Sequence, residues 1–496
     1  MEKIILAIDQ GTTGSTVMLF NQLGEIVGRS YSEFTQYYPQ PGWVEHDALE
    51  IWQVTQRVIT EAMGTAGIDA NQIECIGITN QRETTVIWDK KSGQPIHPAI
   101  VWQCRRTSEF CDQLQAAGYE PLFREKTGLV IDAYFSGTKI KWLLDHIPGA
   151  RKKAEKGELL FGTIDTWLLW NLSGGTVHAT DFTNAARTLI FNIHRKQWDE
   201  ALLKILDIPV AMLPQVQSSS SVFGYTALNS VFKQAIPISG IAGDQQAALF
   251  GQGCWESGSI KNTYGTGCFL IMNTGERPIS SQNGLLLTLA CNQHGQPCYA
   301  LEGSVFIAGA VIQWLRDELK LIRSSTETDQ IAQSVENTNG VYLLPAFVGL
   351  GAPYWEMNVR GAIFGLTRGA NRAHLVRAAL ESIAYQSYDV VQAMARDAGV
   401  AINALRVDGG AAANNFLMQF QADILNLTVD RPQIIETTAS GAAYLAGLAV
   451  EFWNSAADIA QVRLTEKQFY PQMNDQMRKD LLNGWQKAVN TLLGKQ

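Results

Sequence analysis

The chain opens with the stretch IILAIDQGTTGSTVMLF, residues 4–20. Two short apolar runs flank a polar turn that contains Gly11 and Gly14, and this pattern predicts a β-hairpin. Because glycine lets the backbone approach a ligand closely and direct several N–H groups at one anion, such a turn also suits a phosphate group. Asp9 ends the first run, where its carboxylate could hold Mg²⁺ beside bound phosphates.

A similar hairpin is predicted in the second half of the chain. Residues 260–272 read IKNTYGTGCFLIM, again two apolar runs around a Gly-Thr turn. Gly11 and Gly265 lie 254 residues apart, which is about half of the chain. This weak repeat suggests two related lobes, although two unrelated hairpins would give the same pattern.

A third glycine-rich turn, DGGAAANN at residues 408–415, leads into a predicted helix, whose N-terminus would attract an anion. Taken singly, each of the three turns is more often a simple hairpin turn or helix start. The chain contains neither a GxxxxGK[ST] P-loop nor the HRD and DFG motifs of protein kinases. The three turns together, with Asp9 beside the first, favour a different kind of nucleotide site.

Composition narrows the class of protein. The 496 residues include 39 Lys and Arg against 47 Asp and Glu, a net charge of −8, so no broad nucleic-acid-binding surface is expected. The length suffices for two large domains, and strand-like stretches alternate with helix-like ones, which predicts an α/β fold.

The cysteines and the apolar stretches indicate a cytoplasmic enzyme. None of the seven cysteines is spaced CxxC, which argues against a disulfide framework and a structural zinc site. The first apolar run is too short for a signal peptide, and the longest, near residues 442–450, is far too short to span a membrane.

Several longer motifs carry a family resemblance: NQRETT at residues 80–85, VWQCRR at 101–106, YFSGTK at 134–139, GDQQAALFG at 243–251, NTYGTGCF at 262–269 and GAIFGL at 361–366. With the three turns, they resemble the FGGY carbohydrate kinases of the actin/hexokinase/Hsp70-type ATPase superfamily, and among these the members that phosphorylate glycerol. The resemblance runs from Ile4 to about Trp485. It implies two RNase H-like α/β domains, residues 1–245 and 246–496, on either side of a central catalytic cleft.

The resemblance also implies an activity, the ATP-dependent phosphorylation of glycerol to sn-glycerol 3-phosphate in glycerol uptake and catabolism, by a homodimer or homotetramer. The general base of the family falls on Asp244. From the residues alone, Asp244 before an apolar helical segment is equally well an N-cap. Asp9 and Asp244 are the implied holders of Mg²⁺, the second cofactor beside ATP.

The implied glycerol contacts combine polar groups with an apolar wall: Arg82, Glu83, Trp102, Tyr134, Asp244, Gln245 and Phe269. Without the resemblance, Arg82 and Glu83 would be read as a surface ion pair and the aromatic residues as core. The implied ATP contacts begin in the first turn and continue in the second half of the chain: Thr12, Thr13, Gly14, Thr266, Gly309, Gln313, Gly410 and Asn414.

Two alternatives stay open at this point. One is another FGGY sugar kinase with a pentulose acceptor, which Trp102 and Phe269 would hinder. The other is a nucleotide-binding regulatory homologue with reduced catalysis, because Gly14 and Thr16 stand where related kinases usually have Ser and Arg. A neutral threonine gives no charge-assisted bond to phosphate, so weaker nucleotide binding or a substitute cation is expected.

Overall fold

The computed structural model describes residues 2–495, which group into two compact units. Unit 1 contains the chain as far as Trp255, together with Leu287–Tyr299 and Thr437–Arg463. Unit 2 contains Glu256–Leu286, Ala300–Glu436 and the chain from Leu464 onward. The boundary expected after residue 245 lies near the end of the first segment of unit 1, and two later segments return to that unit. Within residues 2–495, no helix is long and apolar enough to cross a membrane.

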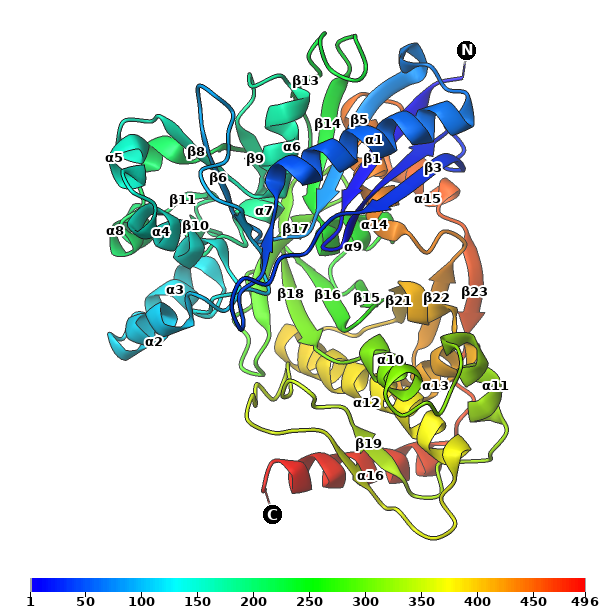
Figure 1. The fold of residues 1–496 in the computed structure, drawn as a ribbon. Coiled ribbons are helices and arrows are strands. Elements are labelled where there is room, and N and C mark those ends of the chain that lie inside the picture. The colour runs from blue at the N-terminus through cyan, green and yellow to red at the C-terminus, as the bar shows by residue number, and fades with distance from the viewer. Residues whose placement is uncertain (1, 496) are drawn as a thin grey trace. The chain divides into compact units, whose positions relative to one another are not determined.

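Unit 1 is built on a six-stranded mixed sheet (Figure 1). In sheet order its strands are β13 (Ser220–Tyr225), β14 (Pro237–Gly243), β5 (Ile73–Asn80), β1 (Ile4–Gln10), β2 (Gly14–Phe20) and β3 (Ile26–Glu33). β1, β5 and β14 run parallel, and the predicted hairpin is the antiparallel pair β1–β2. The carboxyl ends of three parallel strands therefore meet at one edge.

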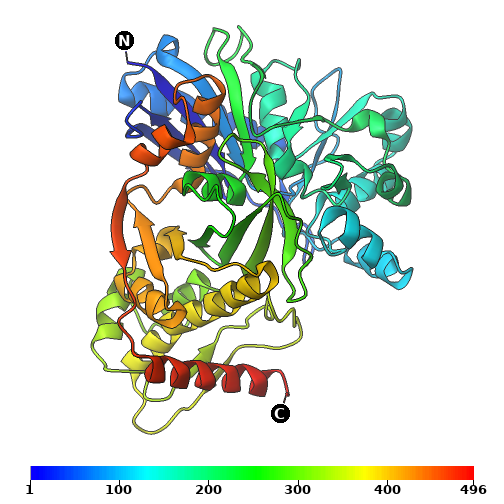
Figure 2. The ribbon, with the colours of Figure 1, turned by 180° about the vertical axis from the view of Figure 1, so that it is seen from behind.

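Both faces of this sheet are covered, which explains why β1 is apolar at consecutive positions. Ile4, Leu6 and Ile8 join a core with α1 (Ala48–Ala66) and α6 (Ile164–Leu172). Ile5 and Ala7 join a second core with α9 (Asp244–Gly251) and α14 (Thr437–Ala449). Seen from behind in Figure 2, the orange segment with α14 lies against the blue strands of this unit.

The other elements of unit 1 are short. The helices are α2 (Ser108–Ala116), α3 (Glu120–Thr127), α4 (Ser136–His146), α5 (Ala150–Glu155), α7 (Phe182–Ala185), α8 (Glu200–Leu206) and α15 (Ala456–Val462), with 3₁₀ turns η1 (Ala70–Gln72) and η2 (Val210–Met212). The strand pairs are β4 (Glu45–His46) with β7 (Ala99–Ile100), β6 (Val86–Asp89) with β8 (Leu159–Gly162), β9 (Ala179–Asp181) with β12 (Gln215–Gln217), and β10 (Phe191–Asn192) with β11 (Gln197–Trp198).

A second sheet organises unit 2. Its strands there are, in sheet order, β18 (Pro297–Val305, in unit 2 from Ala300), β16 (Cys268–Gly275), β15 (Ile260–Tyr264), β21 (Ala404–Asp408), β22 (Thr428–Pro432) and β23 (Thr465–Phe469). Apart from its first residue, β17 (Leu286–Cys291) belongs to the segment Leu287–Tyr299 of unit 1. The second predicted hairpin is the antiparallel pair β15–β16, and β21 runs parallel to β15. β19 (Tyr342–Leu344) and β20 (Ala362–Phe364) form a separate pair.

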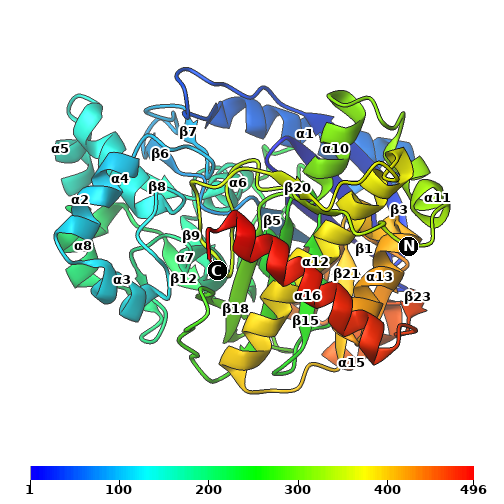
Figure 3. The same ribbon diagram turned by 90° about the horizontal axis from the view of Figure 1, so that it is seen from below.

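The long helix α12 (Arg372–Ala398) supplies much of the core of unit 2. The C-terminal helix α16 (Asp475–Leu492) packs on it (Figure 3). Trp485 of α16 stacks on Tyr385 of α12, with ring centroids 5.1 Å apart. The remaining elements are α10 (Gly309–Asp317), η3 (Ser325–Glu327), α11 (Thr328–Gln333), η4 (Gly410–Ala413) and α13 (Asn415–Leu425). These last elements surround the pocket described below.

Candidate active site

The acceptor residues expected in unit 1 follow the ends of the parallel strands. The register pairs Gln10 with Asn80, and Asn80 with Gly243, so β1, β5 and β14 end side by side. The N–H of Gln81 donates to the carbonyl of Gln10 at 2.7 Å, which ties the chain after β5 to the end of β1. Arg82 and Asp244 follow directly, and parallel strand ends of this kind are common ligand sites.

Arg82 and Asp244 form an ion pair, with 3.2 Å between Arg82 Nε and Asp244 Oδ1. The Arg82 side chain is 2% exposed and that of Asp244 is 31% exposed, so the carboxylate lies open at the end of a buried guanidinium. Gly243 is the N-cap of α9 and Asp244 is its first residue. The alternative assignment of Asp244 as an N-cap therefore does not describe this helix.

Glu83 is held from several sides. Its carboxylate receives the Nε–H of Arg187 at 2.6 Å, and both side chains are buried. Its carbonyl oxygen accepts hydrogen bonds from Ser136 at 3.0 Å and from the ammonium of Lys139 at 3.2 Å. Its φ of 63° is a left-handed conformation, rare for a residue with a Cβ, which these contacts hold in place.

Lys139 also donates to the carbonyl of Tyr134 at 2.6 Å. Burial lowers the pKa of the Lys139 ammonium to about 8, although the negative charge of Glu83 acts to raise it. Sequence reasoning missed Lys139 and Arg187 as supports of this site. Lys139 stands in the motif at residues 134–139, which was an available signal, whereas nothing in the sequence pairs Arg187 with Glu83.

One of the aromatic residues expected near glycerol, Trp102, contacts the first phosphate turn. Trp102 donates its Nε1–H to the hydroxyl of Thr12 at 3.0 Å. Its ring meets that of Tyr134 edge-on, with centroids 5.5 Å apart. Gln245 is the second residue of α9 and is largely buried, whereas Phe269 lies on β16 in unit 2.

Packing around the first turn explains why Gly14 stands where related kinases usually have Ser. A Cβ on Gly14 would approach Tyr31 Cε2 to 2.5 Å and the carbonyl oxygen of Ser32 to 2.7 Å. A larger residue at position 14 therefore conflicts with β3 in this chain. Thr16 stands between Asp9 and Tyr31 in the sheet, with Thr13 in the turn before it.

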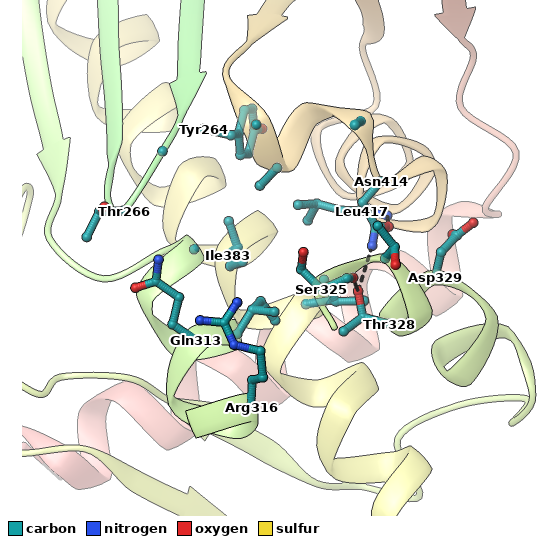
Figure 4. A pocket seen from close by; sticks show the side chains of 18 residues that line it. Tyr264, Thr266, Gln313, Arg316, Ser325, Thr328, Asp329, Ile383, Asn414 and Leu417 are labelled. Atoms are coloured by element: carbon teal, nitrogen blue, oxygen red, sulfur yellow. Dashed lines mark hydrogen bonds between the residues drawn. The ribbon is translucent and has the colours of Figure 1, made fainter. Parts of the chain in front are cut away.

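A pocket of about 390 Å³ lies in unit 2 (Figure 4). Five residues expected to contact ATP all line it: Thr266, Gly309, Gln313, Gly410 and Asn414. They come from the β15–β16 turn, α10, η4 and the start of α13, which lie far apart in sequence. The structure thus brings these five residues together, whereas Thr12, Thr13 and Gly14 belong to unit 1.

The pocket combines an apolar wall with a polar rim, as sites for flat, partly polar ligands do. Ile312, Leu380, Ile383 and Leu417 form much of the wall. In Figure 4, Gln313 and Arg316 lie on one side of the pocket, opposite the hydrogen bond between Asn414 and Thr328. The sequence did not predict Arg316 as a pocket residue, although its position three residues after Gln313 places it on the same helix face.

Two of the pocket residues have structural tasks as well. Asn414 caps α13 by accepting the N–H of Leu417 at 2.9 Å, and its amide donates to Thr328 at 3.0 Å. A Cβ on Gly309 would come within 2.6 Å of the carbonyl oxygen of Gly265, so α10 can begin this close to the turn only with glycine. In contrast, a Cβ on Gly410 would meet nothing within 4 Å.

Asp9 and Asp244, the two carboxylates expected to hold Mg²⁺, lie at the ends of two strands of the unit 1 sheet. Their strands flank β5, because Asp9 pairs with Thr79 and Gly243 with Asn80. The described residues contain no cluster of three or more His, Cys, Asp or Glu that could hold a metal. Mg²⁺ typically takes only one or two carboxylates plus phosphate oxygens and waters, so two carboxylates without a third are compatible with it.

The two sheet-based units and the pocket in unit 2 fit the carbohydrate kinase class that the family comparison identifies. The N-terminal domain of the FGGY family of carbohydrate kinases matches residues 4–251, and its C-terminal domain matches residues 260–450. The chain belongs to this family.

Individual relatives make the comparison more specific. The chain is 59% identical over 493 residues to the glycerol kinases of Geobacillus kaustophilus (strain HTA426) and Thermus thermophilus, covering 99% of this chain and of each relative. It superposes on the crystal structure of Plasmodium falciparum glycerol kinase with ADP at a TM-score of 0.93 and 39% identity, over 99% of this chain and 98% of that one. The xylulose kinase of Lactobacillus acidophilus shares the fold, with a TM-score of 0.89 over 99% of this chain and 98% of that one, at 22% identity.

Proposed function

We propose that this chain phosphorylates glycerol with ATP and releases sn-glycerol 3-phosphate and ADP. The choice of glycerol as the acceptor rests on the 59% identity, over 99% of both chains, to proteins named glycerol kinase. The likeness to xylulose kinases is a likeness of fold at 22% identity, so it does not favour a pentulose. The open carboxylate of Asp244 argues for catalysis rather than a purely regulatory role.

The acceptor site of this proposal uses Arg82, Glu83 and Gln245 for the glycerol hydroxyls. A three-carbon triol needs several hydrogen-bond partners and an apolar surface for its CH groups. Trp102 and Tyr134 supply that surface in unit 1, and Phe269 supplies a further contact. Support comes from the 3.2 Å Arg82–Asp244 pair and the edge-on rings of Trp102 and Tyr134.

Asp244 is the proposed general base. Its carboxylate takes the proton of the terminal hydroxyl while that oxygen attacks the γ-phosphorus of ATP, and the bond from phosphorus to the ADP oxygen breaks. The ion pair with buried Arg82 fixes the direction of the carboxylate. The partial exposure of Asp244 leaves an oxygen available to a substrate.

For the nucleotide, we propose the unit 2 pocket around Thr266, Gly309, Gln313, Gly410 and Asn414. Its apolar wall suits a base and its polar rim suits a ribose. The backbone of Thr12, Thr13 and Gly14 would donate to the phosphates. Mg²⁺ at Asp9 and Asp244, when bound, neutralises phosphate charge.

The proposal extends to the setting of the enzyme. The family domains would divide near residues 245–246, close to the gap between the two family matches. The proposed enzyme acts in glycerol catabolism in the cytoplasm and does not bind nucleic acid. It assembles into a homodimer or homotetramer.

The test is ADP release from Mg·ATP with glycerol, xylulose, ribulose or dihydroxyacetone, each against a reaction without acceptor. We expect strong stimulation by glycerol. Stimulation by a pentulose alone would overturn the acceptor, and nucleotide binding without stimulation by any acceptor would favour the regulatory alternative.

A further inference from the structure

A buried carboxylate lies behind the acceptor site and is not used by the proposed mechanism. Asp181 is fully buried at the end of β9, where it caps the short helix α7. It accepts hydrogen bonds from the N–H and hydroxyl of Thr183 at 2.9 and 2.7 Å, and from the N–H and amide of Asn184, both at 2.9 Å. The hydroxyl of Ser219 donates at 2.6 Å.

All these partners donate, so the carboxylate acts only as an acceptor. Burial raises the pKa of Asp181, and the same hydrogen bonds oppose that rise. A buried carboxylate is unfavourable unless its oxygens are satisfied, and here five donors satisfy them. The hydroxyl of Thr183 donates its hydrogen to Asp181. The lone pairs of the same hydroxyl oxygen can therefore accept a hydrogen bond from another group.

One arm of this network reaches the strand that precedes Asp244. The N–H of Gly243 donates to the hydroxyl of Thr183 at 2.9 Å. Gly243 is the last residue of β14 and the N-cap of α9. The chain Asp181–Thr183–Gly243 therefore anchors the backbone immediately before the proposed base.

The second arm reaches the strand that precedes Arg82. Asn184 and Asn80 exchange amide hydrogen bonds at 3.1 and 3.0 Å. Asn80 also donates to the carbonyl of Gln81 at 3.0 Å, at the end of β5. Asp181 thus connects, through two neighbouring residues of α7, to both strand ends that carry the Arg82–Asp244 pair.

We propose that Asp181, acting through Thr183 and Asn184, is a positioning residue that sets the placement of Asp244 relative to Arg82 for phosphoryl transfer. This inference rests on the proposed function. A satisfied buried network restricts motion of the groups it joins, and a displacement of about 1 Å at a reacting group can lower a rate by about 10²-fold. None of the network residues is among the proposed glycerol or ATP contacts, so we expect their effect on turnover rather than on binding.

The central experiment compares Thr183→Val with Thr183→Ser. Valine has nearly the shape of threonine but removes the acceptor for the Gly243 N–H, whereas serine keeps the hydroxyl. We expect Thr183→Val to lower kcat for glycerol by about 10-fold to 100-fold with the KM for ATP unchanged, and Thr183→Ser to retain turnover.

Thr226→Val is the matched control. The buried hydroxyl of Thr226 accepts the N–H of Ile236 at 2.9 Å, just before the opposite end of β14. This substitution removes the same kind of bond from the residue that precedes the other end of β14, seven residues before Gly243. Its kcat should stay near that of the unsubstituted protein, even if its melting temperature falls as much as that of Thr183→Val.

Amide hydrogen exchange gives a second readout that does not depend on activity. Exchange in the peptide that contains Gly243 should accelerate in Thr183→Val and not in Thr183→Ser. If Thr183→Val does not fold, Thr183→Ala, which leaves room for a water, takes its place in both measurements.

The outcomes separate this inference from the proposed function. If the unsubstituted protein shows no glycerol-dependent ADP release, the proposed function fails, and exchange at Gly243 still tests the anchor. If the unsubstituted protein phosphorylates glycerol and folded Thr183→Val has the same kcat, the positioning role is wrong. An equal loss of kcat in Thr226→Val would also overturn it, because general destabilisation would then explain both.

Discussion

Asp244 is accessible to substrate, whereas Arg82, its ion-pair partner 3.2 Å away, is buried. This asymmetry fits a base whose direction is fixed from behind while its other oxygen faces a ligand. The pair joins residues that lie far apart in sequence, so each strand end must be correctly placed for the pair to form. At the residue scale, the proposed mechanism therefore depends on the Asp244 carboxylate more than on any single binding contact.

Replacing Asp244 with asparagine keeps the shape and removes the base. We expect kcat for glycerol to fall by about 10²–10⁴-fold, the usual range for loss of a general base, while the protein stays folded. The measurement is glycerol-dependent ADP release beside a melting curve. Asp145→Asn, at a partly exposed ion pair with Lys141, is the control and should keep full turnover. Near-normal turnover in Asp244→Asn would refute the assignment.

Gly14 gives a prediction about stability. Gly14→Ser restores the residue usual in related kinases, but its Cβ would lie 2.7 Å from the carbonyl oxygen of Ser32 and 2.5 Å from the Tyr31 ring. We expect a loss of about 1–3 kcal/mol in the free energy of unfolding, the usual range for an overpacked site, measured by urea titration.

The cause is testable with a second substitution. Tyr31→Ala removes the ring contact and leaves the backbone contact, so Gly14→Ser should be less damaging in that background than alone. An unchanged stability of Gly14→Ser would show that β3 adapts easily and that the glycine has another origin.

At the scale of elements, α14 is placed by backbone packing. A Cβ on Gly441 would overlap the carbonyl oxygen of Ala247 in α9, and a Cβ on Gly251 would lie 2.9 Å from the N of Gly441. Glycines at both positions allow the two helices to touch backbone to backbone. Since α9 begins with Asp244, the packing of α14 bears directly on the site.

Gly441→Ala should therefore affect both stability and turnover. We expect a loss of at least about 1–3 kcal/mol in unfolding free energy together with a lower kcat, because α9 has to shift away from α14. Gly64→Ala is the control: Gly64 is also in a helix, α1, and a Cβ there meets nothing within 4 Å, so alanine should be neutral or stabilising. A stable, fully active Gly441→Ala would contradict this account of the helix contact.

The two hairpins could be predicted from the sequence because their signal is local: an apolar run, a glycine turn and a second apolar run. The return of α14 to unit 1 could not, since no local pattern links Gly441 to Ala247. The site shows the same division. Asp244 and Arg82 stand in motifs, whereas the pairing of Arg187 with Glu83, 104 residues away, is set only by the tertiary fold.

At the scale of the whole molecule, buried histidines give the protein a dependence on pH. Burial lowers the pKa of His178 to about 4, and that of His46 likewise to about 4. Unfolded histidine binds a proton near pH 6.5, so between about pH 6.5 and 4 the unfolded state holds protons that the folded state does not. The contribution of these two histidines to stability therefore falls as the pH falls through this window.

Substitution of His178 tests this dependence. His178→Gln should reduce the slope by at most about 1.4 kcal/mol per pH unit, measured as urea midpoints at several pH values. Asp165, whose pKa burial raises to about 6, acts in the opposite direction, but it is common to both proteins and cancels in the comparison. His294→Gln, at an exposed position, should leave the slope unchanged. An unaltered slope in His178→Gln would show that this histidine is not the source.

The division of ligands between the two units is the broadest prediction. A ligand that binds only the folded state stabilises the region it contacts, so ADP alone should slow amide exchange in α10, η3, α11 and the start of α13, which line the pocket. Glycerol alone should slow exchange at residues 80–84 and at the start of α9. Gln313→Ala, on the pocket wall, should weaken the protection by ADP and leave that by glycerol intact. If ADP protected only unit 1, the pocket would not be the nucleotide site, and the nucleotide contacts proposed in the second half of the chain would have to be abandoned.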